Sequence, residues 1–584
     1  MYGILLRQAE KENQEDLMME MEEEKKILPL GEDDFRIVRE SKTESYYVDK
    51  SLMIRDFLRE EKRVTLITRP RRFGKTLNMT MLRDFLDINQ KSRDIFKGLA
   101  IMDTKYADDI NTVPVIYLSL KNCNGKNVEI MEAAVAEEMF NAYKNHAKHL
   151  KGVDENDDAY LRFFQTLEIF RRVPKNEKGE DSVLRVEHIQ KNLIFVQNSL
   201  SYLIEALHTF YQVRPIVLID EYDNPIIEAH QLGFREEFTN FYSTFLTTAL
   251  KGNPHLKQAL LTGIQRVAKE SIFSKLNNPV VYNVLDEYYS SYFGLTEQET
   301  STLLNYYNLK LDAEVKSYYD GYSFAGLEIY NPWSILNYAY WKILKAYWLN
   351  TSTNALIKES VINADFNFHR SFERLIKNSE VEISLNLEAA FAELPRTDTL
   401  WGLFVNSGYL TVTQVDYQLN LFTVQIPNEE IITEFRTIVS SYTKLSSQLL
   451  QEMLIALIKG NMEDFFKIYQ KLVLESTSYY DTKENAYHML MLGMVMHLRE
   501  LYEITSNIES GHGRSDIILK SKNHDRFHLV IEFKQGEAVE ELKYKALKQI
   551  HDKKYYAGLT GEVLCIGIAH DKKRCELVHE IIDN

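Results

Sequence analysis

The chain has 584 residues, of which 45% are hydrophobic and 26% charged, and its formal net charge is −16. This length exceeds what one hydrophobic core normally supports, so we expect two to four globular domains. The negative charge excludes a basic surface over the whole chain, of the kind that binds nucleic acid nonspecifically, but it leaves room for a local basic groove.

The start of the sequence and its cysteines indicate a cytoplasmic protein. The segment MYGILLRQAEKENQ lacks the basic and apolar regions of a signal peptide. No run approaches the ~20 apolar residues of a membrane span, so we expect no membrane association. Cys123, Cys565 and Cys575 are scattered without metal-ligand spacing, which fits a reducing compartment.

The first part of the chain has the pattern of an α/β domain. Residues 1–27 form a charged arm, either a solvated helix or a disordered segment. From residue 28 to about 290, short apolar runs rich in β-branched residues alternate with amphipathic helices, which predicts a mostly parallel sheet with flanking helices. The predicted strands are Val64–Thr68, Val115–Leu120, Ile216–Ile219 and Gln258–Thr262, and the predicted helices include Ser51–Glu60, Leu77–Ile88 and Phe234–Leu250.

The remaining sequence divides into three further regions. Residues 291–345 have a helical, aromatic pattern with a turn at Asp320–Tyr322. Residues 346–474 form a mixed, mostly helical middle region without an assigned role, and they end in the helical stretch Ser446–Leu474. Residues 475–584 predict a small α/β domain: a helix over Lys483–Glu503, two strands, a basic helix and a further strand.

The first candidate site is the loop that ends in Gly74–Lys75–Thr76, between a predicted strand and a predicted helix. In a P-loop, glycine lets backbone N–H groups approach phosphate oxygens, lysine neutralises the β- and γ-phosphates, and the hydroxyl binds Mg²⁺. The N-terminus of the helix also favours an anion. Arg69 stands where the first glycine of G-x4-G-K-[ST] is expected, so the motif is degenerate, and an ordinary basic turn would contain the same three residues.

A second element supports the nucleotide site. The apolar strand over 216–219 is followed by Asp220 and Glu221. Asp220 could hold Mg²⁺ through water and Glu221 could polarise the attacking water, because ligand sites in open α/β sheets lie at this strand edge. A helix N-cap would also explain the acidic pair. Together the two strand-preceded signals predict that ATP and Mg²⁺ bind here.

Three weaker candidates accompany this site. Thr262 ends a predicted strand and could sense the γ-phosphate. Arg72 or Arg266 could stabilise charge during phosphoryl transfer. For each of them, the sequence favours a structural role over a functional one.

A second candidate site lies near the C-terminus, where Asp516 opens one apolar strand and Glu532 and Lys534 end the next. Because side chains alternate along a strand, Glu532 and Lys534 share one face and Phe533 points to the other. Asp516 and Glu532 would bind Mg²⁺ or Mn²⁺, and Lys534 would orient a water for attack on a phosphodiester. Glu484, on the preceding predicted helix, could add a third carboxylate.

The helix predicted over Lys543–Tyr556 is basic and aromatic, which suits contact with a phosphate backbone. The pattern D…ExK is nevertheless loose on its own. Charged residues on the surface of an antiparallel sheet would produce it as well.

These segments resemble a known family. ITRPRRFGKTLNMTMLRDFL, VLIDEYDNPI and LLTGIQRVAKESIFSKLNN resemble the bacterial AAA-ATPase-like family. SNIESGHGRSDIIL, VIEFK and ALKQIHDKKYY resemble the PD-(D/E)XK nuclease-like domain that often follows it, and the resemblance covers about residues 28–340 and 475–584.

The resemblance implies a P-loop NTPase fold and a restriction-endonuclease-like α/β fold. It implies that Gly74, Lys75 and Thr76 contact nucleotide phosphates and Mg²⁺, and that Asp220 and Glu221 form the Walker B pair. It also implies a nuclease-like centre at Glu484, Asp516, Glu532 and Lys534, with Gln549 and Tyr555 in support. The arginine-rich loop is the form that this family has.

Three functions remain open from the sequence. The first is an ATP-regulated, metal-dependent nuclease that acts on DNA, for example in defence against foreign DNA. The second is an ATP-dependent switch that binds a protein or a nucleic acid without cutting. The third is a nuclease whose ATPase-like half is an inactive scaffold. Self-association also remains open, because no segment of the sequence identifies an interface.

Overall fold

The computed structural model describes residues 25–584, except 41–43, 155–156, 172–180, 267–277, several positions between 349 and 395, 436–446, 477–497, 499–500, 511–512, 524–525 and 572–573. The chain forms two compact units. The first runs to Tyr347 and includes Glu388–Ala392 and Asn406–Gly408, and the second contains the rest. Within the described ranges, no helix combines the length and the apolar character that crossing a membrane requires.

A five-stranded parallel sheet forms the core of the first unit. Its strand order is β2-β3-β4-β1-β5. The central strands β1, β3 and β4 are buried along their whole length, as expected where helices cover both faces of a sheet. The strands are β1 (Val64–Thr68), β2 (Val115–Ser119), β3 (Ile216–Asp220), β4 (Gln258–Gly263) and β5 (Val280–Tyr282). The first four match the predicted strands to within one residue at each end, and β5 was not predicted.

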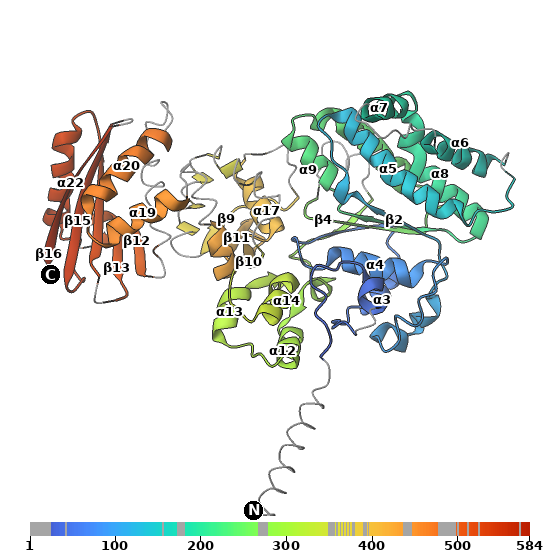
Figure 1. Cartoon of the computed structure of the whole chain (residues 1–584), viewed down its shortest axis with the longest axis horizontal. Helices are drawn as coiled ribbons and strands as arrows, with labels where there is room; N and C mark the ends of the chain where they lie inside the picture. The colour runs from blue at the N-terminus through green and yellow to red at the C-terminus, as the bar shows by residue number, and fades with distance from the viewer. Residues whose placement is uncertain are drawn as a thin grey trace, which may run out of the picture. The chain divides into compact units, whose positions relative to one another are not determined.

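Helices cover both faces of this sheet. In Figure 1, α3 and α4 lie on one side of the sheet, and α5 and α8 lie on the other. The helices of this part are α2 (Phe35–Glu40), α3 (Leu52–Glu60), α4 (Lys75–Leu86), α5 (Val128–Ala147), α6 (Asp158–Arg171), α7 (Asp181–Lys191), α8 (Leu193–Tyr211), α9 (Asn224–Gln231) and α10 (Arg235–Leu250). Short 3-10 helices cover Ala100–Asp103, Lys105–Asp109, Leu120–Asn122 and Ser290–Tyr292.

The segment predicted to be a helical extension also contains a sheet. Strands β6 (Leu295–Thr296), β7 (Tyr322–Phe324) and β8 (Leu327–Tyr330) pair antiparallel in the order β6-β8-β7. They accompany helices α12 (Glu297–Tyr306), α13 (Ala313–Tyr319) and α14 (Pro332–Trp341). The purely helical prediction was therefore wrong here, because strands of two to four residues are too short to show a period of two in the sequence.

The middle of the chain, most of which belongs to the second unit, is mixed. Strands β9 (Glu380–Ile383), β10 (Thr411–Asp416) and β11 (Leu421–Gln425) form an antiparallel sheet in the order β10-β11-β9. Helix α17 covers Thr397–Ser407. The predicted helical stretch that follows is the pair α19 (Ser447–Ile458) and α20 (Met462–Ser476).

The C-terminal part of the second unit is a five-stranded mixed sheet with the order β12-β13-β14-β15-β16. Its strands are β12 (Tyr502–Ser510), β13 (Gly513–Ser521), β14 (His528–Gln535), β15 (Glu562–Asp571) and β16 (Arg574–Asp583). Only β14 and β15 pair in parallel, so the chain must cross over between them. Helix α22 (Val539–Lys553) makes this crossover and packs on β14, β15 and β16.

Two predictions for this part need correction. The predicted helix Lys483–Glu503 lies mostly outside the described residues, but its last two residues belong to β12. Tyr502 and Glu503 pair with Ser521 and Lys520 of β13, so strand pairing overrides their local helical pattern. The last strand, β16, was not predicted either.

Candidate functional sites

The loop between β1 and α4 ends at a glycine in a left-handed conformation. Gly74 is the N-cap of α4 and has a φ of 83°, in the left-handed region that glycine adopts without strain. Lys75 is the first residue of α4 and is buried. Its Nζ donates to the carbonyls of Arg69 and Pro70, at 3.0 and 2.9 Å. Burial lowers the pKa of Lys75, whereas nearby carboxylates, first that of Glu221, raise it.

Arg69 is fully buried at the position of the missing glycine. Its Nη1 donates to the carbonyls of Thr68 at 2.8 Å and Tyr282 at 3.1 Å. The guanidinium also lies 5.5 and 5.3 Å from the ring centres of Phe293 and Phe324. Burial lowers the pKa of Arg69 to about 9, which leaves the side chain charged at neutral pH. Arg69 thus ties the loop to β5 and to the segment that follows it.

Asp220, the last residue of β3, joins two predicted site residues. Its Oδ2 accepts a hydrogen bond from Thr76 Oγ1 at 2.6 Å, and its Oδ1 accepts one from Thr262 Oγ1 at 2.5 Å. Thr262 can reach Asp220 because β4 lies between β3 and β1 in the sheet. The carboxylate and hydroxyl oxygens gathered here are ligands that suit Mg²⁺.

Glu221 follows Asp220 in a left-handed backbone conformation, with a φ of 51°. Burial raises the pKa of Glu221, and Lys75 opposes this rise. Lys75, Thr76, Asp220, Glu221 and Thr262 together are called the P-loop cluster below.

Asp223 is a site-forming residue that the sequence analysis missed. It is buried, and its Oδ2 accepts hydrogen bonds from the backbone N–H groups of Ile264 at 2.8 Å and Gln265 at 2.9 Å. It therefore fixes the chain directly after Thr262 to the end of β3. A signal was available, because Asp223 precedes Asn224–Pro225 at the start of α9, and proline in the first turn marks a helix start.

The two candidate arginines have partners elsewhere. Arg72 is exposed, and its guanidinium lies 4.3 Å from the ring centre of Trp333. Arg266 forms an ion pair with Glu388 at 2.5 Å.

The second candidate site lies on neighbouring strands β13 and β14. Asp516 is one residue beyond the pair Ile517–Ile531, so it faces Glu532 across the antiparallel ladder. The Asp516 N–H donates to Glu532 Oε2 at 3.3 Å, and Asp516 Oδ2 accepts from the Phe533 N–H at 2.7 Å. Lys534 Nζ donates to Glu532 Oε1 at 3.0 Å. The structure thus brings together the three residues of the D…ExK pattern.

A glutamine of helix α22 donates a hydrogen bond to this carboxylate pair. Gln549 Nε2 donates to Glu532 Oε1 and, at 2.9 Å, to the hydroxyl of Tyr555. Glu532 is 2% exposed. Burial, together with the charge of Asp516, raises the pKa of Glu532 to about 7, against the opposing effect of Lys534.

The oxygen atoms of Asp516 and Glu532 suit a hard cation such as Mg²⁺ or Mn²⁺. The proposed third carboxylate, Glu484, lies outside the described residues. In the part of the chain that the structure describes, no group of three or more His, Cys, Asp or Glu side chains has the arrangement of a metal site.

Comparisons with known proteins match the two parts of the chain that contain these candidate sites. Residues 29–273 match the family described as predicted AAA-ATPase. Residues 482–580 match the PD-(D/E)XK nuclease superfamily. The chain joins an AAA-ATPase-like domain to a PD-(D/E)XK nuclease-superfamily domain. The two resemblances stated from the sequence are confirmed, as is the α/β fold class with a parallel sheet flanked by helices.

One curated relative spans nearly the whole chain. A protein of Azotobacter chroococcum mcd 1, described as an uncharacterized protein in the vnfD 5' region, is 25% identical over 553 residues, which cover 89% of this chain and 93% of the relative. A solved structure, the Walker-type ATPase PABY2304 of Pyrococcus abyssi, covers 67% of this chain and 96% of that chain at 14% identity and a TM-score of 0.34. This structural likeness is too distant to carry an inference about the present chain.

Proposed function

We propose that this protein binds ATP·Mg²⁺ at the P-loop cluster and that the bound nucleotide regulates a metal-dependent nuclease centre at Asp516, Glu532 and Lys534, which cleaves DNA. The observation that carries the proposal is that one chain contains two such groups of residues. Thr76 and Thr262 donate hydrogen bonds to Asp220. Lys534 and the Asp516 N–H donate hydrogen bonds to Glu532. Defence against foreign DNA is a biological setting that such a regulated activity would suit.

The nucleotide half of the proposal assigns a role to each residue of the cluster. The Lys75 ammonium would bind the β- and γ-phosphates in place of the two loop carbonyls that it now contacts. Thr76 and Asp220 would hold Mg²⁺, and Glu221 would accept a proton from an attacking water. ATP binding requires only the contact between Lys75 and the phosphates, so the proposal supports binding more firmly than hydrolysis.

The nuclease half rests on the carboxylate pair. Asp516 and Glu532 would hold a divalent cation, which when bound supplies positive charge next to the scissile phosphate. Lys534, fixed by its bond to Glu532, would orient the attacking water. Gln549 keeps Glu532 in place from α22, so the centre is held by a strand on one side and a helix on the other.

The test is cleavage of plasmid DNA by the full chain with Mg²⁺ or Mn²⁺, with and without ATP. We expect ATP to change the rate for the wild type, Lys534→Ala to abolish cleavage, and Lys75→Ala to remove the response to ATP. The exposed Lys520 on the same sheet provides a control, Lys520→Ala, that should cleave normally. Equal product from the wild type and Lys534→Ala would refute the nuclease. Cleavage that is indifferent to ATP and to Asp220→Asn would identify the ATPase-like half as a scaffold.

A second function, an ATP-dependent switch that binds a partner without cutting, is favoured by the net charge of −16 and by the buried Arg69 in the loop. It predicts ATP-dependent retention of DNA or protein by the wild type with no cleavage under any metal. Cleavage that disappears in Lys534→Ala would reject this alternative.

A further inference from the structure

Glu221 lies in a turn directly after β3, and its backbone has an unusual conformation. Its φ of 51° lies in the left-handed region, which glycine adopts readily and a residue with a long side chain rarely adopts. The Asn224 N–H donates to the Glu221 carbonyl at 3.1 Å and closes the turn. A residue keeps such a conformation only where the surrounding structure holds it. The contacts of the residues next to Glu221 therefore decide where its carboxylate lies.

Tyr222, the next residue, is bound to the end of β4. Its N–H donates to the Thr262 carbonyl at 3.0 Å, and its hydroxyl donates to the carbonyl of Gln265 at 2.7 Å. The Tyr222 carbonyl accepts from the hydroxyl of Tyr242, on α10, at 2.6 Å. Both tyrosine side chains are fully buried. Tyr222 is thus fixed through its backbone and through its side chain.

Asp223 makes a second connection to the same part of the chain. Its Oδ2 accepts from the N–H groups of Ile264 at 2.8 Å and Gln265 at 2.9 Å. The fit is close, because a Cβ added at Gly263 would lie 2.6 Å from Asp223 Oδ1 and 2.8 Å from a ring carbon of Tyr222. Tyr222 and Asp223, with the chain that they bind at the end of β4, are called the β3–β4 clamp below.

The β3–β4 clamp also contacts the P-loop. The Arg69 N–H donates to the carbonyl of Gly263 at 3.1 Å, so the glycine that lies against Asp223 is also bound to the loop. The Arg69 carbonyl in turn accepts from Lys75 Nζ at 3.0 Å. The clamp therefore fixes the position of Glu221 in relation to the lysine that would bind the phosphates.

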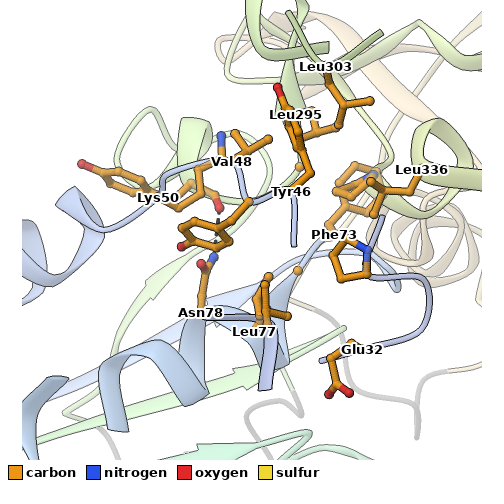
Figure 2. Close-up of a pocket in the computed structure, with 17 residues that line it drawn as sticks. Glu32, Tyr46, Val48, Lys50, Phe73, Leu77, Asn78, Leu295, Leu303 and Leu336 are labelled. Atoms are coloured by element: carbon orange, nitrogen blue, oxygen red, sulfur yellow. Dashed lines mark hydrogen bonds between the residues drawn. The ribbon is translucent and has the colours of Figure 1, made fainter. Parts of the chain in front are cut away.

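A different part of the chain also holds the P-loop. The Gly294 N–H donates to the Phe73 carbonyl at 3.0 Å, and Asn78 Nδ2 donates to the Tyr292 carbonyl at 2.9 Å. In Figure 2, Phe73 and Asn78 border a pocket, and Leu295 lies across it from Asn78. These contacts do not involve the β3–β4 clamp. We therefore expect them to keep the loop in place when the clamp is changed.

We propose that Tyr222 and Asp223 are positioning residues for Glu221 in the hydrolysis of bound ATP, an inference that rests on the proposed function. In this step the water oxygen bonds to the γ-phosphorus and Glu221 takes the proton. The bond between the γ-phosphorus and the bridging oxygen breaks, and its electron pair leaves with ADP. A base must lie within hydrogen-bond reach of the water, and a displacement of about 1 Å can lower a rate about 100-fold. Changes in the clamp should therefore affect turnover more than binding.

The experiment measures phosphate release at saturating ATP·Mg²⁺, ATP affinity by calorimetry and the unfolding temperature, all on the full chain. Asp223→Ala removes the acceptor for the two backbone N–H groups. We expect its turnover to fall about tenfold or more, while its affinity for ATP stays within about twofold of the wild type. Asp223→Asn keeps a carbonyl oxygen that can accept the same hydrogen bonds, so it should recover most of the turnover.

A second variant tests the tyrosine without removing its ring. Tyr222→Phe loses only the hydrogen bond from the hydroxyl to Gln265. We expect its turnover to fall about threefold or more, with unchanged affinity for ATP.

The control is Asp87→Ala, at the C-terminal end of α4. Asp87 is also buried and also accepts from a backbone N–H, that of Asn89 at 3.0 Å, but it does not belong to the clamp. We expect it to turn over ATP like the wild type at a temperature where all variants are folded.

Wild-type turnover in folded Asp223→Ala, or in Tyr222→Phe if Asp223→Ala does not fold, would overturn the positioning role. Equal losses of turnover and affinity, an Asp223→Asn variant no better than Asp223→Ala, or an equal loss in Asp87→Ala would also overturn it. A wild type that binds ATP and releases no phosphate would overturn it too, but would leave the proposed ATP binding intact. If the wild type binds no ATP, the inference and the proposed function fail together.

Discussion

Arg69 and Arg72 lie three residues apart in the same loop, but their environments are opposite. Arg69 is fully buried between the carbonyls of Thr68 and Tyr282 and two aromatic rings. Arg72 is exposed, stacks on Trp333, and has a positive φ of 69°. The sequence alone shows two arginines in a degenerate P-loop, and it could not reveal that one is a core residue, because the rings that enclose Arg69 come more than 200 positions later.

This difference predicts contrasting effects of glycine at the two positions. Arg69→Gly restores the residue of an ordinary P-loop, but it should lower the free energy of unfolding by about 3 kcal/mol, because it removes packing and two hydrogen bonds from the core. Arg72→Gly should be nearly neutral, since relief of the positive φ offsets the lost contact with Trp333. Calorimetric unfolding of both variants checks this. An Arg69→Gly variant as stable as the wild type would show that the loop does not depend on the buried guanidinium.

The raised pKa of Glu532 predicts that metal binding depends on pH. Its pKa of about 7 in the metal-free protein means that the carboxylate is mostly protonated at pH 6 and mostly ionised at pH 8. Because a cation binds the ionised form, Mn²⁺ affinity should rise about tenfold between pH 6 and 8. Titration with Mn²⁺ at the two pH values measures this. Glu532→Gln should bind weakly at both, and an equally steep rise in that variant would assign the titration to another group.

The raised pKa of Glu532 also affects the stability of the metal-free protein. Because the pKa of Glu532 is raised in the folded state, the folded chain holds this proton more tightly than the unfolded chain. The resulting stabilisation is fully present below about pH 4.5 and is lost as the pH rises through about 7.

Among the elements, we expect α22 to contact DNA. Its Lys543 is held in ion pairs with Glu540 and Glu576, whereas Lys545 and Lys548 are exposed. The double variant Lys545→Glu/Lys548→Glu should weaken DNA binding and reduce the slope of log affinity against log salt by about 2. Fluorescence anisotropy over a salt series measures both.

The control for α22 is a double variant with the same change of net charge, Lys62→Glu/Lys97→Glu, at exposed positions of the first unit. If both double variants weaken binding equally, the effect is one of overall charge and α22 has no specific part in it.

Elements with a strong local pattern could be predicted, and elements defined by distant partners could not. β1, β3 and β4 are continuous apolar runs that are buried along their length, so the sequence located them to within a residue. β6 has two residues and pairs with β8, more than 30 positions later. Tyr502 and Glu503 continue a helical pattern but pair with β13. In these cases strand pairing with distant residues decides the structure, and the local sequence pattern cannot predict that pairing.

At the scale of the whole molecule, the sequence identifies some residues of the two candidate sites but not others. Short motifs mark the residues that could be predicted, namely Gly74–Thr76, Asp220, Glu532 and Lys534. Asp223 lies within the segment VLIDEYDNPI, but its role could not be found there, because it fixes the chain after β4 through two backbone N–H groups. That role depends on which elements the sheet brings to one edge. Glu484 remains a prediction, because it lies outside the described residues.

The central claim is that ATP binds at Lys75 and that this binding controls the rest of the chain. Titration of ATP·Mg²⁺ into the full-length protein by calorimetry tests the first part most directly. We predict one site per chain, an affinity at least about tenfold lower in Lys75→Ala, because a charge-assisted contact to phosphate is lost, and an unchanged affinity in the control Lys62→Ala, at an exposed lysine. A wild type that binds no ATP, or a Lys75→Ala variant that binds it equally well, would contradict the account.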